Sequence, residues 1–137
     1  VLRVESLFGG ESSNSTVDRM WMDFAAGRPV SAFTDRTVSP SHVGDVARAT
    51  RILIEQGTPG GLYHCVNSGV ATWLEVAERL REWSGFSGVP IKPVSVSDVA
   101  LRARRPQFAA LSNARLVARG IPMPHWAEAL ERHVRRP

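Results

Sequence analysis

Three segments of the chain carry residue types that could bind a charged ligand. Residues 3–10 are a strand-like run ending at a Gly-Gly pair, which would deliver side chains to the carboxyl edge of a sheet, where ligands bind in open α/β sheets. Residues 34–45 form a polar loop that leads into a helix N-terminus, a natural anion site. Residues 102–106 read Arg-Ala-Arg-Arg-Pro, and arginine forks match phosphate oxygens in pairs.

Several motifs that would give the chain its own catalytic or cofactor chemistry are missing from the sequence. It has no Gly-x-Gly-x-x-Gly turn, no Walker motif and no Gly-x-Ser-x-Gly elbow. The only tyrosine, Tyr63, is followed four residues later by Asn67, so no Tyr-x-x-x-Lys pair exists. The four histidines have no Cys, Asp or Glu at metal-ligand spacing. The sequence therefore predicts no catalytic residue and no metal ligand on this chain.

Composition narrows the class of protein. The chain has 137 residues, 43% of them hydrophobic and 22% charged, with a net charge of +4. Its basic residues are mostly scattered arginines without interleaved aromatic side chains, which argues against nucleic acid, although a basic binding module stays an alternative. No apolar run approaches the ~18 residues of a membrane span and no signal peptide is visible, so we expect a cytoplasmic protein without membrane contact. The single cysteine, Cys65, is expected in the core.

The elements that must position these segments alternate between strand-like and helix-like patterns. Apolar residues at helical spacing predict four helices, and a fifth helix and a short helical turn follow from shorter signals. The Thr72-Trp73-Leu74-Glu75 capping box is the clearest helix start, and Ser41 and Ser112 are expected to cap two other helices. The expected helices are 14–26, 42–56, 72–84, 97–101, 112–119 and 126–134, and the expected strands are 1–8, 30–33, 61–67 and 91–96. We read the 137 residues as a single α/β unit.

The order and spacing of these segments resemble a known family. Nearly the whole chain is similar to the C-terminal part of dTDP-4-dehydrorhamnose reductases and related extended short-chain dehydrogenases that act on nucleotide sugars. The segments that carry the resemblance are residues 2–9, 35–47, 61–73, 103–112 and 124–130.

The resemblance implies a fold, and it implies that this chain and the missing part of the protein have different functions. It implies the C-terminal portion of a Rossmann-like extended short-chain dehydrogenase, made of late core strands plus a small α/β substrate lobe. Family members reduce a 4-keto sugar nucleotide by hydride transfer from the reduced form of NADP or NAD, using a Tyr-x-x-x-Lys pair that would precede Val1. The N-terminal Rossmann half, which binds the cofactor, would then be absent from this chain. The chain would bind a nucleotide sugar of the dTDP-sugar class, and it would not catalyse hydride transfer alone. It could belong to a homodimer.

The resemblance also assigns site residues by position. Glu5, Ser6 and Leu7 would lie near the nicotinamide and the sugar. The residues that would contact the nucleotide sugar are Ser39, Ser41, His42, Arg104 and Arg105.

Two departures from the family pattern leave an alternative open. Val4-Glu5-Ser6 stands where the rhamnose enzymes usually carry Thr-Ser-Trp, and Arg36 stands where glutamine is typical. A non-catalytic homologue that binds a nucleotide sugar or a partner protein is therefore the second interpretation.

Other roles for the assigned residues also stay open. Ser39 and Ser41 could be loop and cap residues. Arg104 and Arg105 could clamp the lobe through Asp98 or Glu131.

Overall fold

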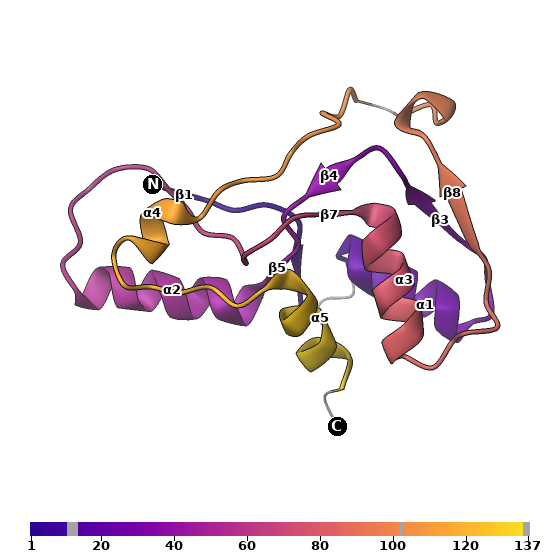
Figure 1. Ribbon diagram of the computed structural model, residues 1–137, viewed down its shortest axis with the longest axis horizontal. Helices are drawn as coiled ribbons and strands as arrows, with labels where there is room; N and C mark the ends of the chain where they lie inside the picture. Colours follow the sequence, from indigo (N-terminus) through magenta and orange to yellow (C-terminus); the bar gives the residue numbers. More distant parts are fainter. Residues whose placement is uncertain (11–13, 102, 136–137) are drawn as a thin grey trace.

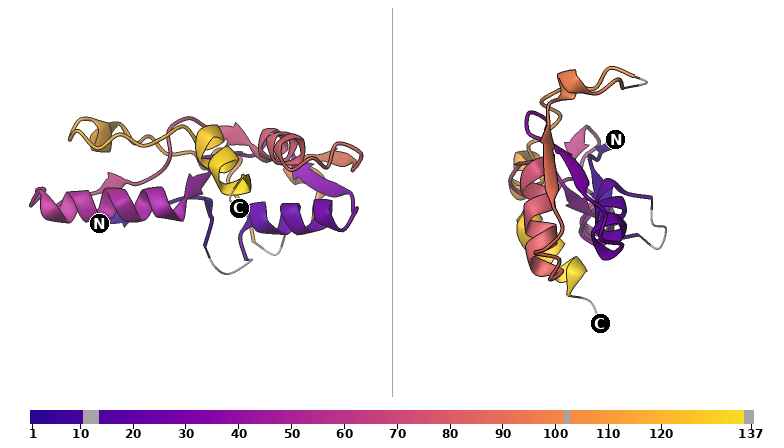
Figure 2. Two further views of the ribbon diagram at one scale, coloured as in Figure 1. Left: turned by 90° about the horizontal axis from the view of Figure 1, so that it is seen from below. Right: turned by 90° about the vertical axis from the view of Figure 1, so that its right-hand side faces the viewer.

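The computed structural model describes residues 1–10, 14–101 and 103–135. Figure 1 shows an elongated molecule in which α2 lies at one end, a group formed by α1, α3, β3 and β8 lies at the other, and α5 lies between them. In the left view of Figure 2, α2 and α1 lie along one side of the molecule, and α4 and α3 lie along the other. Within the described residues, no helix has both the length and the apolar character needed to cross a membrane.

The opening segment forms two short strands instead of the one that its apolar pattern suggested. β1 (Leu2–Arg3) pairs in parallel with β6 (Tyr63–His64), and β2 (Leu7–Phe8) pairs in parallel with β5 (Ser41–His42). Between them Ser6 has a φ of 44°, a left-handed conformation that ends the extended backbone. The expected strand 61–67 is likewise reduced to two residues.

The lobe at the other end follows the sequence pattern closely. α1 (Thr16–Ala25) begins at Ser15 and buries Val17, Met20 and Phe24. β3 (Val30–Phe33) has its predicted bounds and pairs in parallel with β8 (Ile91–Val94). These two strands supply the sheet against which the lobe helices pack.

α3 (Trp73–Trp83) starts at the capping box that the sequence predicts. The Thr72 hydroxyl accepts the Glu75 amide at 3.2 Å, and the Glu75 carboxylate accepts the Thr72 amide at 2.6 Å. The helix buries Trp73 and Leu80 against the lobe sheet, and it contacts both α1 and α5 (Trp126–Val134), whose predicted bounds are confirmed.

Three helix starts differ from the sequence prediction. α2 (Val43–Glu55) is capped by His42, whose Nδ1 accepts the Gly44 amide at 3.1 Å. Ser41 cannot cap it, because its hydroxyl donates to the Ser39 carbonyl and accepts the Asn67 amide. α4 (Ala114–Val117) follows Asn113 rather than Ser112 and is only four residues long. The expected short helix is a 3₁₀ turn, η1 (Val96–Asp98).

One further pair of strands joins the two ends. β4 (Thr37–Val38) runs antiparallel to β7 (Ala71–Thr72), and the chain bridges once more between Thr37 and Phe108. Apolar side chains bury in two clusters. The larger surrounds α3, and the smaller lies under α2 and is lined by Ala49, Leu53, Tyr63, Cys65, Leu116, Ile121 and Met123.

Candidate functional site

A cavity of about 500 Å³ lies where the end of β1, the first turns of α1 and the end of β3 meet. This volume falls in the range of small-molecule sites. Its wall combines apolar and charged side chains from segments that are far apart in the sequence. The lining residues are Glu5, Ser6, Leu7, Thr16, Arg19, Met20, Ser31, Ala32, Phe33, Arg36, Trp73, Leu101 and Arg105.

Glu5 is the one carboxylate among the described residues that line this cavity. One of its oxygens accepts the backbone N–H of Ser39, and the other accepts the hydroxyl of Ser6. Burial raises the pKa of the Glu5 carboxyl above its ordinary value, and the Ser6 hydroxyl, the Ser39 amide and the positive charge of Arg36 oppose that rise. The carboxylate is therefore fixed by hydrogen bonds in a partly dehydrated wall.

Ser6 holds the backbone in a conformation that few residues other than glycine adopt. Its φ of 44° is the only positive value among the described non-glycine residues. Such strain of about 1–3 kcal/mol persists where surrounding contacts impose it, and it is common at ligand sites. Here it turns the chain between β1 and β2 so that Glu5, Ser6 and Leu7 all reach the cavity.

Three arginines share the cavity with Glu5. Among the described residues that line the cavity, Arg19, Arg36 and Arg105 carry three positive charges against the one negative charge of Glu5, which leaves a net charge of +2. Within the described part of the chain, none of the three has a carboxylate within the 4.0 Å of an ion pair, and the buried Nε of Arg36 lacks a hydrogen-bond partner. The cavity can therefore hold an anion.

Asp35 anchors the loop that carries Arg36 to the segment that carries Arg105. Its carboxylate accepts the Ser95 hydroxyl at 2.7 Å, the Val96 amide at 2.9 Å and the Gln107 side-chain amide at 3.2 Å. These hydrogen bonds, chiefly the one from Ser95, hold the pKa of Asp35 below its ordinary value. This network explains how two arginines that are 69 positions apart come to line one cavity.

The predicted contacts Ser39, Ser41 and His42 lie behind the wall. They are 0%, 0% and 2% exposed, and they are not among the residues that line the cavity. The Ser39 hydroxyl accepts the Leu111 amide at 2.9 Å, while its own N–H holds Glu5. In the structure, these three residues support the wall of the cavity from behind.

His42 also explains why the Gly-Gly pair follows β2. A Cβ at Gly9, which has a φ of 87°, would lie 2.4 Å from atoms of the His42 ring. The position therefore needs glycine on steric and conformational grounds.

Of the two predicted arginines, only Arg105 reaches this cavity. Arg104 lines a neighbouring hollow of about 470 Å³ with Ser97 and Gln107, and Arg105 borders both. Arg102 lies outside the described residues. In the part of the chain that is described, neither Arg104 nor Arg105 pairs with Asp98 or Glu131. Glu131 pairs with Arg135 at 2.9 Å.

The sequence analysis missed several functional positions. Arg19 and Trp73 line the cavity although their local patterns signal only a surface and a core residue. A buried polar network also went unrecognised. Asp45 accepts Asn67 at 3.0 Å and pairs with Arg132 at 2.7 Å, which joins α2 to α5. No local spacing could reveal a contact between residues 87 positions apart.

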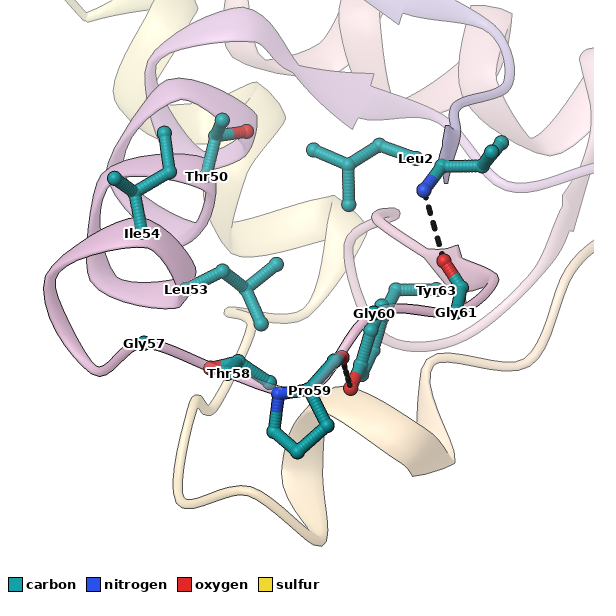
Figure 3. A pocket seen from close by; sticks show the side chains of 11 residues that line it. Leu2, Thr50, Leu53, Ile54, Gly57, Thr58, Pro59, Gly60, Gly61 and Tyr63 are labelled. Atoms are coloured by element: carbon teal, nitrogen blue, oxygen red, sulfur yellow. Dashed lines mark hydrogen bonds between the residues drawn. The ribbon is translucent and has the colours of Figure 1, made fainter.

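A second cavity of about 320 Å³ lies beside β1 and α2. Figure 3 shows that Leu2, Leu53 and Ile54 border it, together with the turn from Gly57 to Gly61. The hydrogen bonds that the figure draws tie Val1 to Gly61 and Tyr63 to Pro59, both within the wall. It holds no charged side chain, so it lacks the chemistry of the first cavity.

Comparison with known proteins gives the chain its family. The model described as the RmlD substrate binding domain matches residues 1–136. A dTDP-4-dehydrorhamnose reductase of Mycobacterium tuberculosis is 30% identical over 131 residues, which are 95% of this chain and 43% of that protein. The spore coat polysaccharide biosynthesis protein SpsK of Bacillus subtilis is 29% identical over 134 residues, which are 98% of this chain and 46% of that protein.

Solved structures agree with the sequence matches. The crystal structure of a dTDP-4-dehydrorhamnose reductase from Bacillus anthracis in complex with NADP matches with a TM-score of 0.88 at 28% identity, covering 96% of this chain and 46% of that one. A UDP-glucose 4-epimerase of Thermus thermophilus shares the fold, with a TM-score of 0.76 at 21% identity.

These matches confirm the predicted fold class, the C-terminal part of a Rossmann-like extended short-chain dehydrogenase. The chain spans less than half the length of the relatives it matches. It belongs to the family of RmlD substrate-binding domains.

Proposed function

We propose that this chain is the nucleotide-sugar-binding part of an NAD(P)H-dependent 4-keto-sugar nucleotide reductase. The observation that carries the proposal is the arginine-lined cavity within a chain that matches the family model over residues 1–136. A net charge of +2 suits the diphosphate of a nucleotide sugar, and the volume suits part of such a ligand. The relatives' names support the dTDP-sugar class as substrate.

The proposal gives this chain's residues positioning roles. Arg36 and Arg105 would bind the diphosphate, and Glu5, Ser6 and Leu7 would border the place where sugar and nicotinamide meet. Ser39, Ser41 and His42 would hold that border in place from behind, and Arg104 would extend the positive surface. When bound, the nicotinamide cofactor supplies the hydride that reduces the ketone.

Catalysis would need residues outside this chain. A Tyr-x-x-x-Lys pair is missing from the sequence, so the proton donor would come from a Rossmann half elsewhere in the protein. The apolar cavity beside β1 and α2 supports such a partner, because Ile54 in its wall is 74% exposed (Figure 3). The NADP complex of the Bacillus anthracis relative supports NADP as the cofactor. A cytoplasmic location and a homodimer complete the proposal, and cell fractionation and sedimentation equilibrium test them.

Calorimetry and turnover on the full-length protein that contains these residues test the main proposal. We expect binding of NADPH and of a dTDP-4-keto-6-deoxy sugar, and oxidation of NADPH when both are present. The Arg105→Gln variant should weaken binding of the sugar nucleotide about tenfold or more, because charge-assisted pairs are worth about 1.5–3 kcal/mol. Arg119→Gln, in the exposed turn that follows α4, is the matched control.

The outcomes separate the two interpretations. Binding of the sugar nucleotide without NADPH oxidation would favour the non-catalytic homologue that Glu5 suggests. Failure of the sugar nucleotide to bind, or equal loss from Arg105→Gln and Arg119→Gln, would contradict the proposed site.

A further inference from the structure

We propose that Glu5 is a specificity-determining residue that makes the cavity select a nucleotide sugar with a neutral sugar over one whose sugar carries a carboxylate. The inference rests on the proposed function and names the substrate class more narrowly. It comes from the charges that line the cavity and from the way in which the Glu5 carboxylate is fixed.

Glu5 cannot turn its charge away from the cavity without leaving a buried donor unpaired. Its carboxylate accepts the N–H of Ser39, a residue that is 0% exposed, so that amide has no access to water as a replacement. The Ser6 hydroxyl holds the other oxygen, and the left-handed backbone at Ser6 sets the direction in which the side chain leaves. The negative charge is therefore a fixed part of the wall.

The charge balance of the cavity matches a ligand with two negative charges. Among the described lining residues, three arginines against Glu5 leave +2, and the diphosphate of a nucleotide sugar carries about two negative charges at neutral pH. Since the arginines have no ion-pair partner among the described residues, they are available to the ligand. A neutral sugar would complete that balance.

A carboxylate on the sugar would disturb the charge balance between the ligand and the cavity. It would bring a third negative charge into a partly dehydrated site whose fixed acceptor is also negative, where charges are screened less than in water. Sugar hydroxyl groups, by contrast, donate hydrogen bonds that a carboxylate such as Glu5 accepts. Glu5 therefore disfavours nucleotide sugars whose sugar carries a carboxylate and favours those whose sugar is neutral.

The test compares two ligands that differ only at the sugar, dTDP-glucose and dTDP-glucuronate. Their dissociation constants are measured by calorimetry on the full-length protein that contains these residues. We expect the native protein to bind dTDP-glucose at least about tenfold more tightly. Glu5→Gln, which keeps an acceptor for the Ser39 amide, should bring the two within about threefold, mainly through tighter binding of dTDP-glucuronate. Glu78→Gln, exposed on α3, is the matched control and should keep the native ratio.

A second variant separates charge selection from general anion binding. Arg36→Gln should weaken both ligands by a similar factor, because it removes attraction to the shared diphosphate. Equal binding of the two sugars by the native protein, or an unchanged ratio in Glu5→Gln, would overturn the inference while leaving the proposed function in place. If neither ligand binds the native protein, the inference and the proposed function both fail.

Discussion

The two ends of the chain differ in how completely they cover their apolar side chains. Leu80 on α3 and Leu130 on α5 are 0% exposed, whereas Ile54 on α2 is 74% and Val1 is 88% exposed. In the lobe, α1 and α3 pack on the β3–β8 sheet, and α5 packs against α3. At the other end, α2 contacts β5, α4 contacts β6, and an apolar cavity opens beside α2 (Figure 3). The lobe therefore buries the larger core, and the α2 end combines its smaller buried cluster with an exposed apolar side chain and an open cavity.

The candidate cavity of about 500 Å³ lies on the side of the lobe. Met20, Trp73 and the β3 residues Ser31 to Phe33 form part of its wall, and these residues belong to the lobe elements. Only residues 5–7 come from the segment that follows β1. The stability of the lobe should accordingly decide whether the cavity keeps its shape.

The largest expected effect on the free energy of unfolding comes from shortening a fully buried side chain in the lobe core. Leu80→Ala removes a fully buried side chain where α1, α3 and α5 meet, and it should lower the free energy of unfolding by about 2–5 kcal/mol. Ile54→Ala on α2 should change it by about 0.5 kcal/mol or less, because the side chain is already exposed. Urea unfolding of the two variants measures the difference. Similar losses would show that the α2 end is as well packed as the lobe.

A smaller effect should follow from removing a helix cap. Thr72→Ala removes the hydroxyl that accepts the Glu75 amide at the start of α3, while the backbone N–H of residue 72 can still donate to Glu75, and it should cost about 1 kcal/mol. Ser112→Ala tests the other region, where the hydroxyl accepts the Ala114 amide only at 3.4 Å before a four-residue helix. We expect that loss to be about 0.5 kcal/mol or less. Thermal unfolding followed by circular dichroism compares them, and a larger loss from Ser112→Ala would reverse the comparison.

The features that the sequence predicted are those whose causes are local. The capping box at Thr72 links residues three apart, and the bounds of β3 and α5 follow from short apolar patterns between clear stops. The candidate site was foreseen in part for a similar reason, because residues 5–7 lie together at the end of one apolar run. Arg105 belongs to the arginine-rich run 102–106, and the family resemblance then predicted that it lies in the same site as residues 5–7, far from it in the sequence.

The features that the sequence missed depend on distant partners. The left-handed turn at Ser6 accompanies the contact of Glu5 with an amide 34 residues away. Ser41 has the residue type of a helix cap, but Asn67 takes its hydroxyl and leaves the cap to His42. Ser39 is buried by the same packing, so a residue expected in contact with ligand stands behind the wall.

The smallest expected effects on stability come from two carboxylates, Asp35 at the edge of the lobe and Glu5 after β1, and they should have opposite signs. The pKa of Asp35 is lowered, chiefly by the Ser95 hydrogen bond, so this group stabilises the fold above its ordinary pKa and loses that contribution as the pH falls. The pKa of Glu5 is raised by burial, so its contribution is complete below its ordinary pKa and is lost as the pH rises through the raised value.

Substitution should expose this difference between pH 3 and pH 7, which spans the ordinary carboxyl pKa of about 4. Relative to the native protein, Asp35→Asn should become progressively less stable as the pH rises, because the native charge gains its hydrogen bonds. Glu5→Gln should become progressively more stable, because the native protein must then keep a charge in a partly dehydrated wall. Unfolding in urea at a series of pH values gives both curves. Curves with the same sign would mean that the hydrogen bonds of Glu5 outweigh its burial, and that the cavity wall is as well adapted to a charge as the lobe edge is.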